Sequence, residues 1–376
     1  MRTIIVRYGE LVLKSEPVRR RFERRLVSNI NLTLSGLKYS IRKTRGRIFI
    51  DTSSAASVME RLSKVPGIVS VSPSVKVSAH IDKIRSAAIN AAKRALAPGM
   101  SFAIRTSRVG KHPFSSRDVN VNVGSAILSE IKGVRVNLSS PDREIFMEIR
   151  ENDAYIFTET VKGPGGLPVG TQGRAVALFS GNHNDVVAAY LMMKRGCAMF
   201  PVFFDPRHHA DGRALKLATA SAKKLADFYP KLELRSIPFG KVLDALSKVA
   251  TGGAAYCIYR RSALQAAEAI ARHVGGEAIV TGDDARLLAA LKLTNLNLID
   301  EACGIPVLRP LAGVSGAEIR QLEICVKPPQ RTRGACPFLP PHNVVKPKEI
   351  QRLEDSMKIR SLVEESIRKL RVIKLR

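Results

Sequence analysis

Residues 162–204 read KGPGGLPVGTQGR, AVALF, SGNHND, VVAAYLMMKRG and CAMFPVFF, and this stretch decides how the chain is organised. Its first part, residues 162–174, is crowded with glycine and proline, which exclude a helix or a central strand, so we interpret it as a linker. The apolar run Ala175–Phe179 is typical of a parallel strand buried on both faces. The polar loop Ser180–Asp185 then leads to an apolar helix and a second strand. At the carboxyl edge of a parallel sheet, such a loop attracts anions, phosphate above all.

The charge of the chain points to a polyanionic partner. Its 376 residues include 61 Lys and Arg against 33 Asp and Glu, a formal net charge of +28, and this excess indicates nucleic acid. A generally basic proteome or a thermophile surface is the alternative explanation. Aromatic residues make up only 5% and tryptophan is absent, so a folded RNA recognised by shape and backbone fits better than stacking on single strands.

Length and cysteine content narrow the class of protein further. A chain of 376 residues with 45% hydrophobic residues is long enough for two or three domains with their own cores. No apolar run reaches the roughly 18 residues that a membrane span needs, and the N-terminus reads as a strand rather than a signal peptide. We therefore expect a soluble, cytoplasmic protein with no membrane partner. The five cysteines form no C-x-x-C pair, which argues against a zinc site or a disulfide framework, and the sequence assigns no metal site.

Residues 1–75 follow the order β-α-β-β-α-β of a ferredoxin-like domain. Strands are expected at Thr3–Val6, in a hairpin about Arg45-Gly46, and at Gly67–Val75. The helix expected at Glu16–Leu34 has an apolar residue at every fourth position. Its other face is either a solvated surface or a contact to an RNA backbone, and it carries Arg19, Arg20, Arg21, Arg24 and Arg25.

Residues 76–160 read as helix, strand, helix, strand and hairpin, and this order resembles the THUMP domain, an RNA-binding module. A helix over Ile81–Leu96 and a strand over Ser101–Thr106 precede a basic, turn-rich segment that ends near Ser116. Because that segment corresponds to the basic face of the module, the resemblance implies RNA-backbone contacts by Arg105, Arg108, Lys111 and His112. A surface histidine without a role is the alternative for His112 taken alone.

After the linker 161–174, residues 175–345 alternate strands with helices, which predicts a doubly wound parallel sheet. Strands are expected at Ala175–Phe179, Met199–Phe204, Leu232–Ile237, Ala254–Cys257, Ala278–Val280 and Pro306–Leu308. Helices are expected at Asp185–Arg195, Gly212–Phe228, Val242–Ala250, Arg260–His273, Arg286–Leu293 and Ala317–Cys325. Residues 346–376 are expected to form a closing helix and a basic tail. The predicted fold class is therefore α/β, with ferredoxin-like and THUMP domains before the parallel-sheet domain.

The three-domain order and the motif GGLPVGTQGR at 165–174 resemble the tRNA 4-thiouridine sulfurtransferase family over nearly the whole chain. That family carries a pyrophosphatase loop, Ser-Gly-Gly-x-Asp-Ser, at the position of the loop 180–185. Ser180 and Gly181 match it, whereas Asn182, Asn184 and Asp185 replace its second glycine, its aspartate and its final serine. Asparagine is the least damaging replacement for that glycine, because it tolerates left-handed backbone angles. Asp185 has two interpretations, a carboxylate for magnesium or the cap of the following helix.

The resemblance also implies an ATP-pyrophosphatase-like site, with Mg²⁺ accompanying ATP. The strand ends would frame the adenine, Arg260 and Gly282 would contact the nucleotide, and Leu291 stands where the family usually has a glutamine. The implied ATP-binding residues are Leu178, Phe179, Ser180, Gly181, Asp185, Phe203, Phe204, Arg260, Gly282 and Leu291. Tyr256 and Tyr259 replace two cysteines that some members use for an iron–sulfur cluster, so no cluster is expected.

Cys336, within GACPFLPPH at 334–342, corresponds to the cysteine of the family's catalytic domain that takes part in sulfur transfer. A lone thiol in a proline-rich loop is either an exposed nucleophile or an inert residue. No rhodanese-like domain follows it, so the sulfur is expected to come from a cysteine desulfurase, from another persulfide carrier, or from sulfide itself.

The implied reaction is the conversion of uridine to 4-thiouridine at position 8 of tRNA. ATP adenylylates the uridine oxygen, and sulfur then displaces AMP. The alternative from a different class is a non-catalytic tRNA-binding protein that kept this scaffold and lost ATP chemistry. Another nucleotide-dependent RNA-modifying enzyme is a third interpretation. Some relatives also serve thiamine biosynthesis, and the sequence leaves homodimer formation open.

Overall fold

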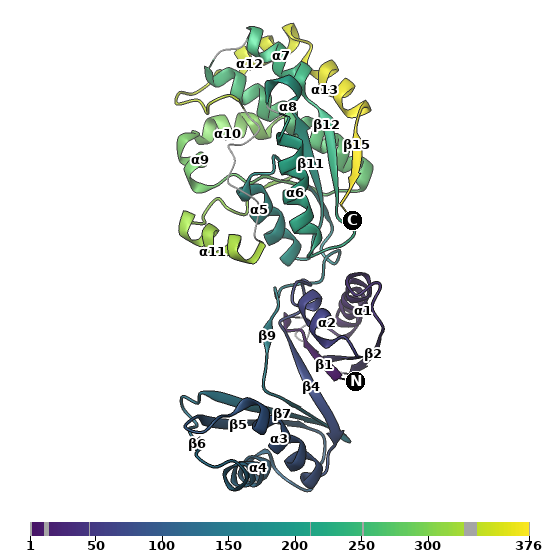
Figure 1. Cartoon of the computed structure of the whole chain (residues 1–376). Helices are drawn as coiled ribbons and strands as arrows, with labels where there is room; N and C mark the ends of the chain where they lie inside the picture. Colours follow the sequence, from purple (N-terminus) through teal and green to yellow (C-terminus); the bar gives the residue numbers. More distant parts are fainter. Residues whose placement is uncertain are drawn as a thin grey trace. The chain divides into compact units, whose positions relative to one another are not determined.

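The computed structural model describes residues 2–10, 15–44, 46–210, 212–249, 252–326 and 337–375. The chain separates into two compact units, drawn in Figure 1. The first unit comprises residues 1–14 and 34–165, and the second comprises residues 15–33 and 166–376. In the part of the chain that the structure describes, no helix combines the length and the apolar character needed to cross a bilayer.

The first unit is built on one nine-stranded sheet with the order β2-β3-β1-β4-β8-β7-β5-β6, and β9 pairs with β4. Its strands are β1 (Arg2–Arg7), β2 (Tyr39–Thr44), β3 (Arg47–Thr52), β4 (Ser70–Ser78), β5 (Ser101–Val109), β6 (Arg135–Val136), β7 (Arg143–Arg150), β8 (Asp153–Phe157) and β9 (Val161–Lys162). Its helices are α2 (Ala55–Leu62), α3 (Ile81–Ala95) and α4 (Ser116–Glu130).

Strand β4 joins the ferredoxin-like and THUMP parts of this sheet. Its first half pairs antiparallel with β1, as in Thr3 opposite Ser74. Its second half pairs antiparallel with β8, as in Val75 opposite Ile156. The expected boundary between residues 75 and 76 therefore falls inside a continuous strand, and both parts share one set of backbone hydrogen bonds.

Helix α1 (Glu16–Thr33) shows the expected amphipathic pattern. Phe22, Leu26 and Ile30 are fully or almost fully buried, whereas the arginines at 20, 21, 24 and 25 are exposed. This helix groups with the second unit, where the side-chain amide of Asn29 donates to the carbonyl of Val169 at 3.1 Å.

The second unit is built on a six-stranded sheet with the order β14-β13-β10-β11-β12-β15. The strands are β10 (Arg174–Leu178), β11 (Ala198–Asp205), β12 (Glu233–Pro238), β13 (Ala278–Val280), β14 (Val307–Leu308) and β15 (Arg371–Lys374). The helices, with the short 3₁₀ turn η2, are α5 (His183–Lys194), η2 (Arg207–His209), α6 (Ala214–Ala226), α7 (Gly240–Val249), α8 (Gly252–Val274), α9 (Ala285–Ala290), α10 (Leu293–Asp300), α11 (Gly316–Val326), α12 (Pro347–Ser356) and α13 (Ile359–Arg368).

Each face of this sheet has its own hydrophobic core. Helices α5, α6 and α11 cover one face, and α7, α8, α10, α12 and α13 cover the other. Strand β10 lies between β11 and β13, and all three run parallel. Because the chain winds outward from β10 in both directions, the carboxyl ends of β10 and β13 mark the topological switch point, where open α/β sheets bind ligands.

Three predictions about the elements were wrong. The strand expected at Ala254–Cys257 lies inside α8, because a short apolar run has the same composition in a buried helix as in a buried strand. The tail after Arg368 forms β15, an antiparallel edge strand on β12. The strand expected at Ser101–Thr106 was placed three residues too short, because β5 continues to Val109.

The linker motif packs closely against the second unit. The carbonyl of Gly196 accepts hydrogen bonds from the backbone N–H groups of Gly170, Thr171 and Gln172, at 2.7, 3.0 and 3.1 Å. At Gly166, with φ of +70°, an added Cβ would lie 2.2 Å from the carbonyl oxygen of Lys194. The glycine-rich sequence is therefore required by close backbone packing as well as by its turns.

Candidate functional site

A cavity of about 580 Å³ lies at the switch point of the second unit's sheet. It is enclosed by the loops after β10 and β13, the starts of α5 and α9, one face of α8, and residues 338 and 340. Its lining residues are Leu178, Phe179, Ser180, Asn182, His183, Asn184, Asp185, Phe204, Tyr256, Tyr259, Arg260, Ala263, Thr281, Gly282, Asp283, Asp284, Arg286, Leu287, Ala290, Phe338 and Pro340.

The loop between β10 and α5 is held by Asp185. Its Oδ2 accepts hydrogen bonds from the backbone N–H and the hydroxyl of Ser180, at 2.8 and 2.6 Å. Helix α5 begins at His183, and its N-cap is Asn182, whose side-chain oxygen accepts from the N–H of Asn184 at 3.4 Å. The alternative in which Asp185 is the helix cap is therefore wrong, because that position belongs to Asn182. Asp185 instead ties the first turn of α5 to the end of β10.

Two glycines allow this close arrangement. Gly181 has φ of +86°, and a Cβ there would lie 2.8 Å from the Cα of Ala218. Gly282 follows β13, and a Cβ there would lie 2.3 Å from Oδ1 of Asp185 and 2.7 Å from its backbone nitrogen. Side chains at these positions would collide with neighbouring atoms, so both loops reach the cavity edge only as glycine backbone.

The carboxyl group of Asp185 is buried, which disfavours its ionised form. Burial raises its pKa to about 6, the hydrogen bonds from Ser180 oppose that rise, and the carboxylate of Asp283 adds to it. Beside it, the side-chain oxygen of Asn184 is buried and has no hydrogen-bond partner among the described residues. Oxygen atoms from carboxylates and amides are the ligands that Mg²⁺ accepts, so Asn184 and Asp185 suit a cation that accompanies phosphate.

A buried ionic network lies behind the loop after β13. Arg260 donates through Nη2 to both oxygens of Asp283, at 2.9 and 2.7 Å. Arg309 donates to Asp283 through Nε at 3.1 Å and to both oxygens of Asp300, at 2.9 and 2.6 Å. Burial alone would raise the pKa of Asp283, but Arg260, a hydrogen bond from Thr281 and Arg309 together outweigh it, and the pKa is lowered. Asp283 therefore stays ionised to lower pH than Asp185 does.

Aromatic side chains form the apolar part of the cavity. Phe204 at the end of β11, Tyr259 on α8 and Phe338 all line it. Phe239 supports them from behind, with ring centroids 5.1 Å from Phe204 and 5.8 Å from Tyr259. The rings of Tyr259 and Phe338 are 6.3 Å apart. The cavity thus joins an aromatic wall, which suits a planar base, to a loop edge with backbone N–H groups.

The structure brings together most of the residues expected at an ATP site. Gly181 lies in the loop itself, although it does not line the cavity. Phe203 is fully buried in the opposite core, because successive strand residues point to opposite faces and only Phe204 can face the cavity. Leu291 is also a core residue, 4% exposed. Cys336 lies outside the described residues. The residues that line the cavity as expected are Leu178, Phe179, Ser180, Asp185, Phe204, Arg260 and Gly282.

Sequence reasoning missed several lining residues. Asp284 caps α9 by accepting from the N–H of Leu287 at 3.0 Å, and Arg286 on α9 faces the cavity with most of its side chain exposed. A signal was present, because Asp283 and Asp284 directly follow a short apolar strand next to β10. Phe338 carried no such signal, since nothing local places a proline-rich loop over α8.

The basic residues expected on the RNA-binding face of the first unit do not all share one side of β5. Side chains alternate along a strand, so Arg105 and Arg108 point to opposite faces. Arg105 pairs with Glu144 at 2.8 Å. Arg108 lies 3.3 Å from Nδ1 of His112, whose Nε2 lies 2.7 Å from the carbonyl oxygen of Glu151. Lys111 is exposed.

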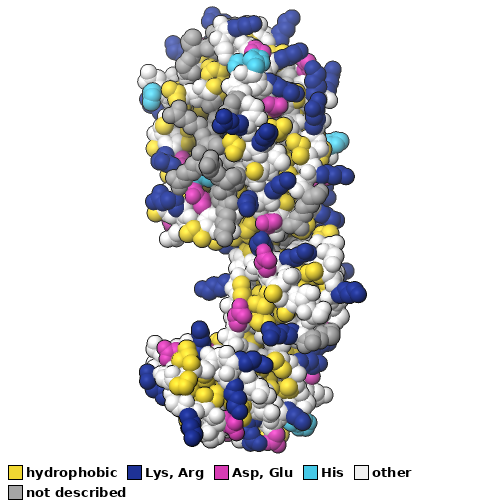
Figure 2. Space-filling model, in the orientation of Figure 1, with side chains coloured by type: hydrophobic (Ala, Val, Ile, Leu, Met, Phe, Trp, Pro, Cys, Tyr) yellow, Lys and Arg dark blue, Asp and Glu magenta, His cyan; other side chains and the backbone are white. Residues whose placement is uncertain are grey.

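Basic side chains are also spread over the second unit. Figure 2 shows Lys and Arg across the visible faces of both units. On α1, exposed arginines line a groove of about 410 Å³ together with the docked linker. Its lining residues are Arg21, Arg24, Arg25, Ser28, Gly170 and Thr171. The arginine face of α1 therefore opens onto a hollow with no acidic lining residue.

Comparison with known proteins gives full-length matches. Residues 3–72 match the ThiI ferredoxin-like domain, residues 78–159 the THUMP domain, and residues 170–359 the family described as thiamine biosynthesis protein (ThiI). A Methanothermobacter thermautotrophicus protein named "Probable tRNA sulfurtransferase" is 35% identical over 97% of this chain and 96% of its own length. A Methanosarcina acetivorans protein of the same name is 34% identical over 99% and 93%.

Solved structures agree with the sequence matches. A crystal structure of a 4-thiouridine synthetase–RNA complex with bound ATP superposes with a TM-score of 0.86 at 29% identity, covering 99% of this chain and 100% of that one. A protein from Pyrococcus horikoshii gives a TM-score of 0.69 at 27% identity, covering 87% and 100%. With its ferredoxin-like, THUMP and parallel-sheet domains in the same order, this chain belongs to the tRNA sulfurtransferase (ThiI) family of enzymes.

Proposed function

We propose that this chain uses ATP to convert uridine at position 8 of tRNA into 4-thiouridine, through an adenylylated uridine. The observation that carries the proposal is the cavity at the switch point, which joins an aromatic wall to a glycine-lined loop and a helix start. The solved relative described as a 4-thiouridine synthetase with RNA and ATP supports it at the level of the whole chain.

The cavity has suitable places for both parts of ATP. The adenine would lie against Leu178, Phe204 and Tyr259. The phosphates would lie at the N-terminus of α5, where the helix dipole favours negative charge. They would compete there with the side chains that accept from the N–H groups of Ser180, Asn182 and Asn184. Mg²⁺ would neutralise the phosphates, and Asp185 with Asn184 would hold it. Arg260, locked onto Asp283, would keep the loop after β13 in place rather than move with the nucleotide.

The reaction needs two displacements. The uridine carbonyl oxygen attacks the α-phosphorus of ATP and pyrophosphate leaves. With sulfide as donor, sulfur then attacks the activated carbon and AMP leaves, which gives 4-thiouridine. With a persulfide on Cys336, its outer sulfur would attack instead, and a second thiol would then cleave the S–S bond and form a disulfide with Cys336 that an external thiol reductant reopens. We assign the sulfur-transfer role to Cys336. The sulfur itself would come from a cysteine desulfurase, from another persulfide carrier or from sulfide. The exposed arginines of α1 and the basic residues around β5 would bind the tRNA backbone.

A non-catalytic tRNA-binding protein on this scaffold is the second candidate. Two observations favour it: asparagine stands at two key positions of the loop, Asn182 and Asn184, and Leu291 is buried in the core where the family usually has a polar nucleotide contact. Against it, the loop is well ordered by hydrogen bonds from Ser180, and Asp185 supplies a carboxylate one position after the one that is missing.

The deciding experiment is thiolation in vitro with purified protein, unmodified tRNA, magnesium-ATP and excess sulfide, which bypasses the sulfur donor. We expect ATP-dependent 4-thiouridine, and its loss in Asp185→Asn but not in the exposed control Asp355→Asn. No product, together with tight tRNA binding and an active control enzyme on the same tRNA, would instead support the non-catalytic candidate. Cys336→Ser should abolish thiolation by a persulfide donor while tRNA affinity stays unchanged, and unchanged thiolation would remove Cys336 from the mechanism.

A further inference from the structure

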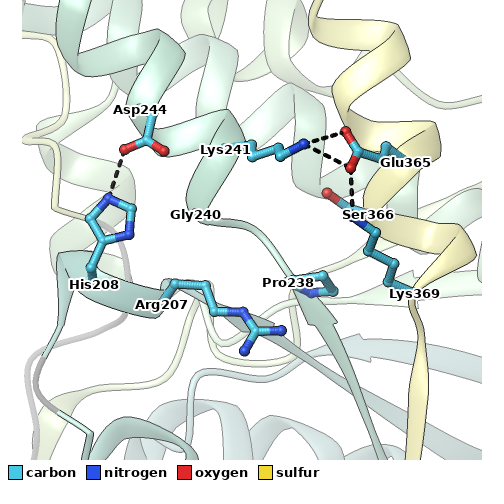
Figure 3. A pocket seen from close by; sticks show the side chains of 9 residues that line it. All are labelled: Arg207, His208, Pro238, Gly240, Lys241, Asp244, Glu365, Ser366 and Lys369. Atoms are coloured by element: carbon cyan, nitrogen blue, oxygen red, sulfur yellow. Dashed lines mark hydrogen bonds and ion pairs between the residues drawn. The ribbon is translucent and has the colours of Figure 1, made fainter.

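A second cavity lies at the same edge of the parallel sheet, beyond the ends of β11 and β12. Its volume is about 270 Å³, and it shares no lining residue with the candidate ATP cavity. Figure 3 shows its walls, which come from η2, the start of α7 and the face of α13. The residues that line it are Arg207, His208, Pro238, Gly240, Lys241, Asp244, Glu365, Ser366 and Lys369.

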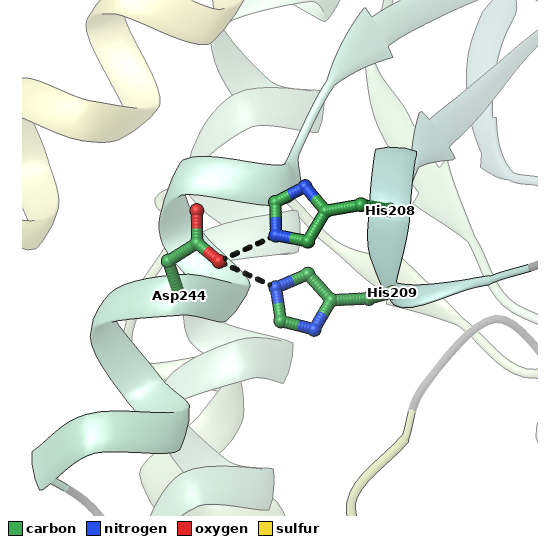
Figure 4. Close-up of side chains that lie close together, drawn as sticks. All are labelled: His208, His209 and Asp244. Atoms are coloured by element: carbon green, nitrogen blue, oxygen red, sulfur yellow. Dashed lines mark hydrogen bonds and ion pairs between the residues drawn. The ribbon is translucent and has the colours of Figure 1, made fainter.

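Three metal-ligating side chains converge at one end of this cavity. Nε2 of His208 and Nε2 of His209 each lie 2.8 Å from the same oxygen, Oδ1 of Asp244. The three ligand atoms all lie within 4.8 Å of one another. Figure 4 shows the two imidazoles reaching from η2 toward the carboxylate on α7, with ring centroids 4.5 Å apart.

The backbone brings two consecutive histidines to one point by an unusual turn. Arg207 has φ of +55°, a left-handed conformation that costs a non-glycine residue roughly 1–2 kcal/mol. The turn is pressed against α7, because a Cβ added at Gly240 would lie 2.9 Å from the Cβ of Arg207. Asp244 follows Gly240 by four residues and therefore lies one helical turn further along the same face. The strained turn and the helix thus share a close contact that fixes their spacing.

We propose that His208, His209 and Asp244 form a binding site for one divalent transition-metal ion, with Zn²⁺ as the reference ion. Two imidazole nitrogens and one carboxylate oxygen are a ligand set that Zn²⁺ and its neighbours in the first transition row accept. Mg²⁺ and Ca²⁺ prefer oxygen ligands alone. Zn²⁺ binds these atoms at about 2.0–2.2 Å, so the two nitrogens, now hydrogen-bonded to Oδ1 at 2.8 Å, would have to move away from it to admit the ion.

The charges around the cluster are compatible with a cation. Lys241 and Lys369 both pair with Glu365, at 2.8 and 2.6 Å. Arg207 pairs with Asp205 at 3.4 Å. The three cationic side chains are thus offset by carboxylates, including that of Asp244.

The bound ion would keep an open coordination position. Three protein ligands leave at least one position of a tetrahedral ion for water or another small ligand. Because His208 and Asp244 line the same cavity as Arg207 and Lys241 (Figure 3), a small ligand could reach the ion from that cavity. The ordinary alternative is a hydrogen-bonded cluster, in which the two imidazoles donate to Asp244 and no metal binds.

Metal titration of the untagged, metal-free full chain separates these two outcomes. With Zn²⁺ in calorimetry, we expect one ion per chain, and with Co²⁺ we expect visible d–d bands without thiolate charge-transfer absorption. His209→Gln and Asp244→Asn should each weaken binding about tenfold or more, while the exposed control His273→Gln leaves it unchanged. Unchanged binding in both cluster variants, thiolate absorption, or the absence of stoichiometric binding would each overturn the proposal.

A variant that keeps every ligand tests the geometry. Gly240→Ala should push the turn at Arg207 away from α7 and weaken Zn²⁺ binding several-fold, with an unchanged circular dichroism spectrum. Because the variant retains all three ligand side chains, a loss would show that the spacing between η2 and α7 matters. Wild-type affinity in Gly240→Ala, combined with wild-type affinity in His209→Gln, would place the ion elsewhere.

Discussion

The loop after β10 and the loop after β11 begin at neighbouring points of one sheet edge, yet they are built for different chemistry. The first, Ser180–Asn182, leads into the N-terminus of α5 and reaches its position only because Gly181 and Gly282 lack side chains. The second, Arg207–His209, presents imidazoles and reaches its position through a strained non-glycine turn. The same parallel sheet places both loops, and the residue types in them select phosphate or a transition metal.

The two sites also differ in how firmly they are anchored. The first rests on Asp283, which is 3% exposed and paired with two arginines. The second rests on Asp244, which is 38% exposed and bonded to the two histidines. Loss of a partner is costly for a buried charge and cheap for an exposed one. Loss of a charged partner should therefore lower the free energy of unfolding more at the first site than at the second.

The largest effect expected is on stability, from Arg260→Met. Removing this side chain leaves Asp283 with only one cationic partner in a buried place, and we expect a loss of about 3 kcal/mol in the free energy of unfolding. Urea denaturation followed by circular dichroism measures it. The matched control is Arg272→Met on the same helix, whose exposed pair with Glu268 should be worth less than about 1 kcal/mol. Equal losses in both variants would show that the network is not an anchor.

The next effect depends on pH, and it concerns Asp185→Asn. The pKa of Asp185 is raised to about 6 in the folded chain from about 3.9 in the unfolded one. The native state therefore loses stability as pH rises from about 4 through about 6, and stays lower above that. The variant lacks this penalty and should be more stable than the wild type at pH 8, by on the order of 1–3 kcal/mol.

Thermal melts of both proteins in metal-free buffer across pH 5–8 measure this difference. The difference in stability between the variant and the wild type should shrink as the pH falls below 6. A variant that is less stable than the wild type at pH 8 would mean that the Ser180 hydrogen bonds outweigh the cost of burying the charge. The same variant loses thiolation if the proposed function holds, so stability and activity should change in opposite directions.

Two glycine substitutions compare the loops directly. Gly282→Ala places a methyl group 2.3 Å from Oδ1 of Asp185, and Gly240→Ala places one 2.9 Å from a side-chain atom of Arg207. We expect ATP affinity to fall about tenfold or more in the first variant and to stay unchanged in the second. Zn²⁺ affinity should show the reverse. Calorimetric titrations of both ligands against both variants check this, and a parallel loss of both affinities in either variant would show that the two sites are one coupled unit.

Local sequence predicted the first loop better than the second. The strands β10 and β11 were evident as short apolar runs, and the polar segment between them has the composition of a phosphate-binding loop. Seven of the 21 lining residues followed from that placement and from the family resemblance. The pairing of Arg260 with Asp283 did not follow from the sequence. The two residues are 23 positions apart, and nothing in the sequence specifies that they pair.

The cluster of His208, His209 and Asp244 shows more clearly what local sequence does not predict. His209 and Asp244 are 35 residues apart, and their meeting depends on the packing of η2 against Gly240. The spacing of the cysteines indicated no metal site, but cysteine spacing carries no information about histidine and aspartate ligands. The misassigned strand at Ala254–Cys257 has a related cause, because an apolar run does not distinguish the two kinds of buried element.

The smallest effects belong to RNA binding, which neither loop is expected to supply. Replacing a basic residue that contacts a phosphate should lower the slope of log affinity against log salt by about 1 and leave ATP and Zn²⁺ affinities unchanged, and the candidates are Arg105, Arg108 and Lys111. Because Arg105 and Arg108 lie on opposite faces of β5, one extended phosphate backbone would engage one face, and only one of the two arginine substitutions should change the slope. Filter binding of tRNA at several salt concentrations measures this, with Lys348→Ala on the exposed surface of α12 as control. An unchanged slope in all three variants would move the RNA contact to another surface, and the exposed arginine face of α1 would then be the next to test.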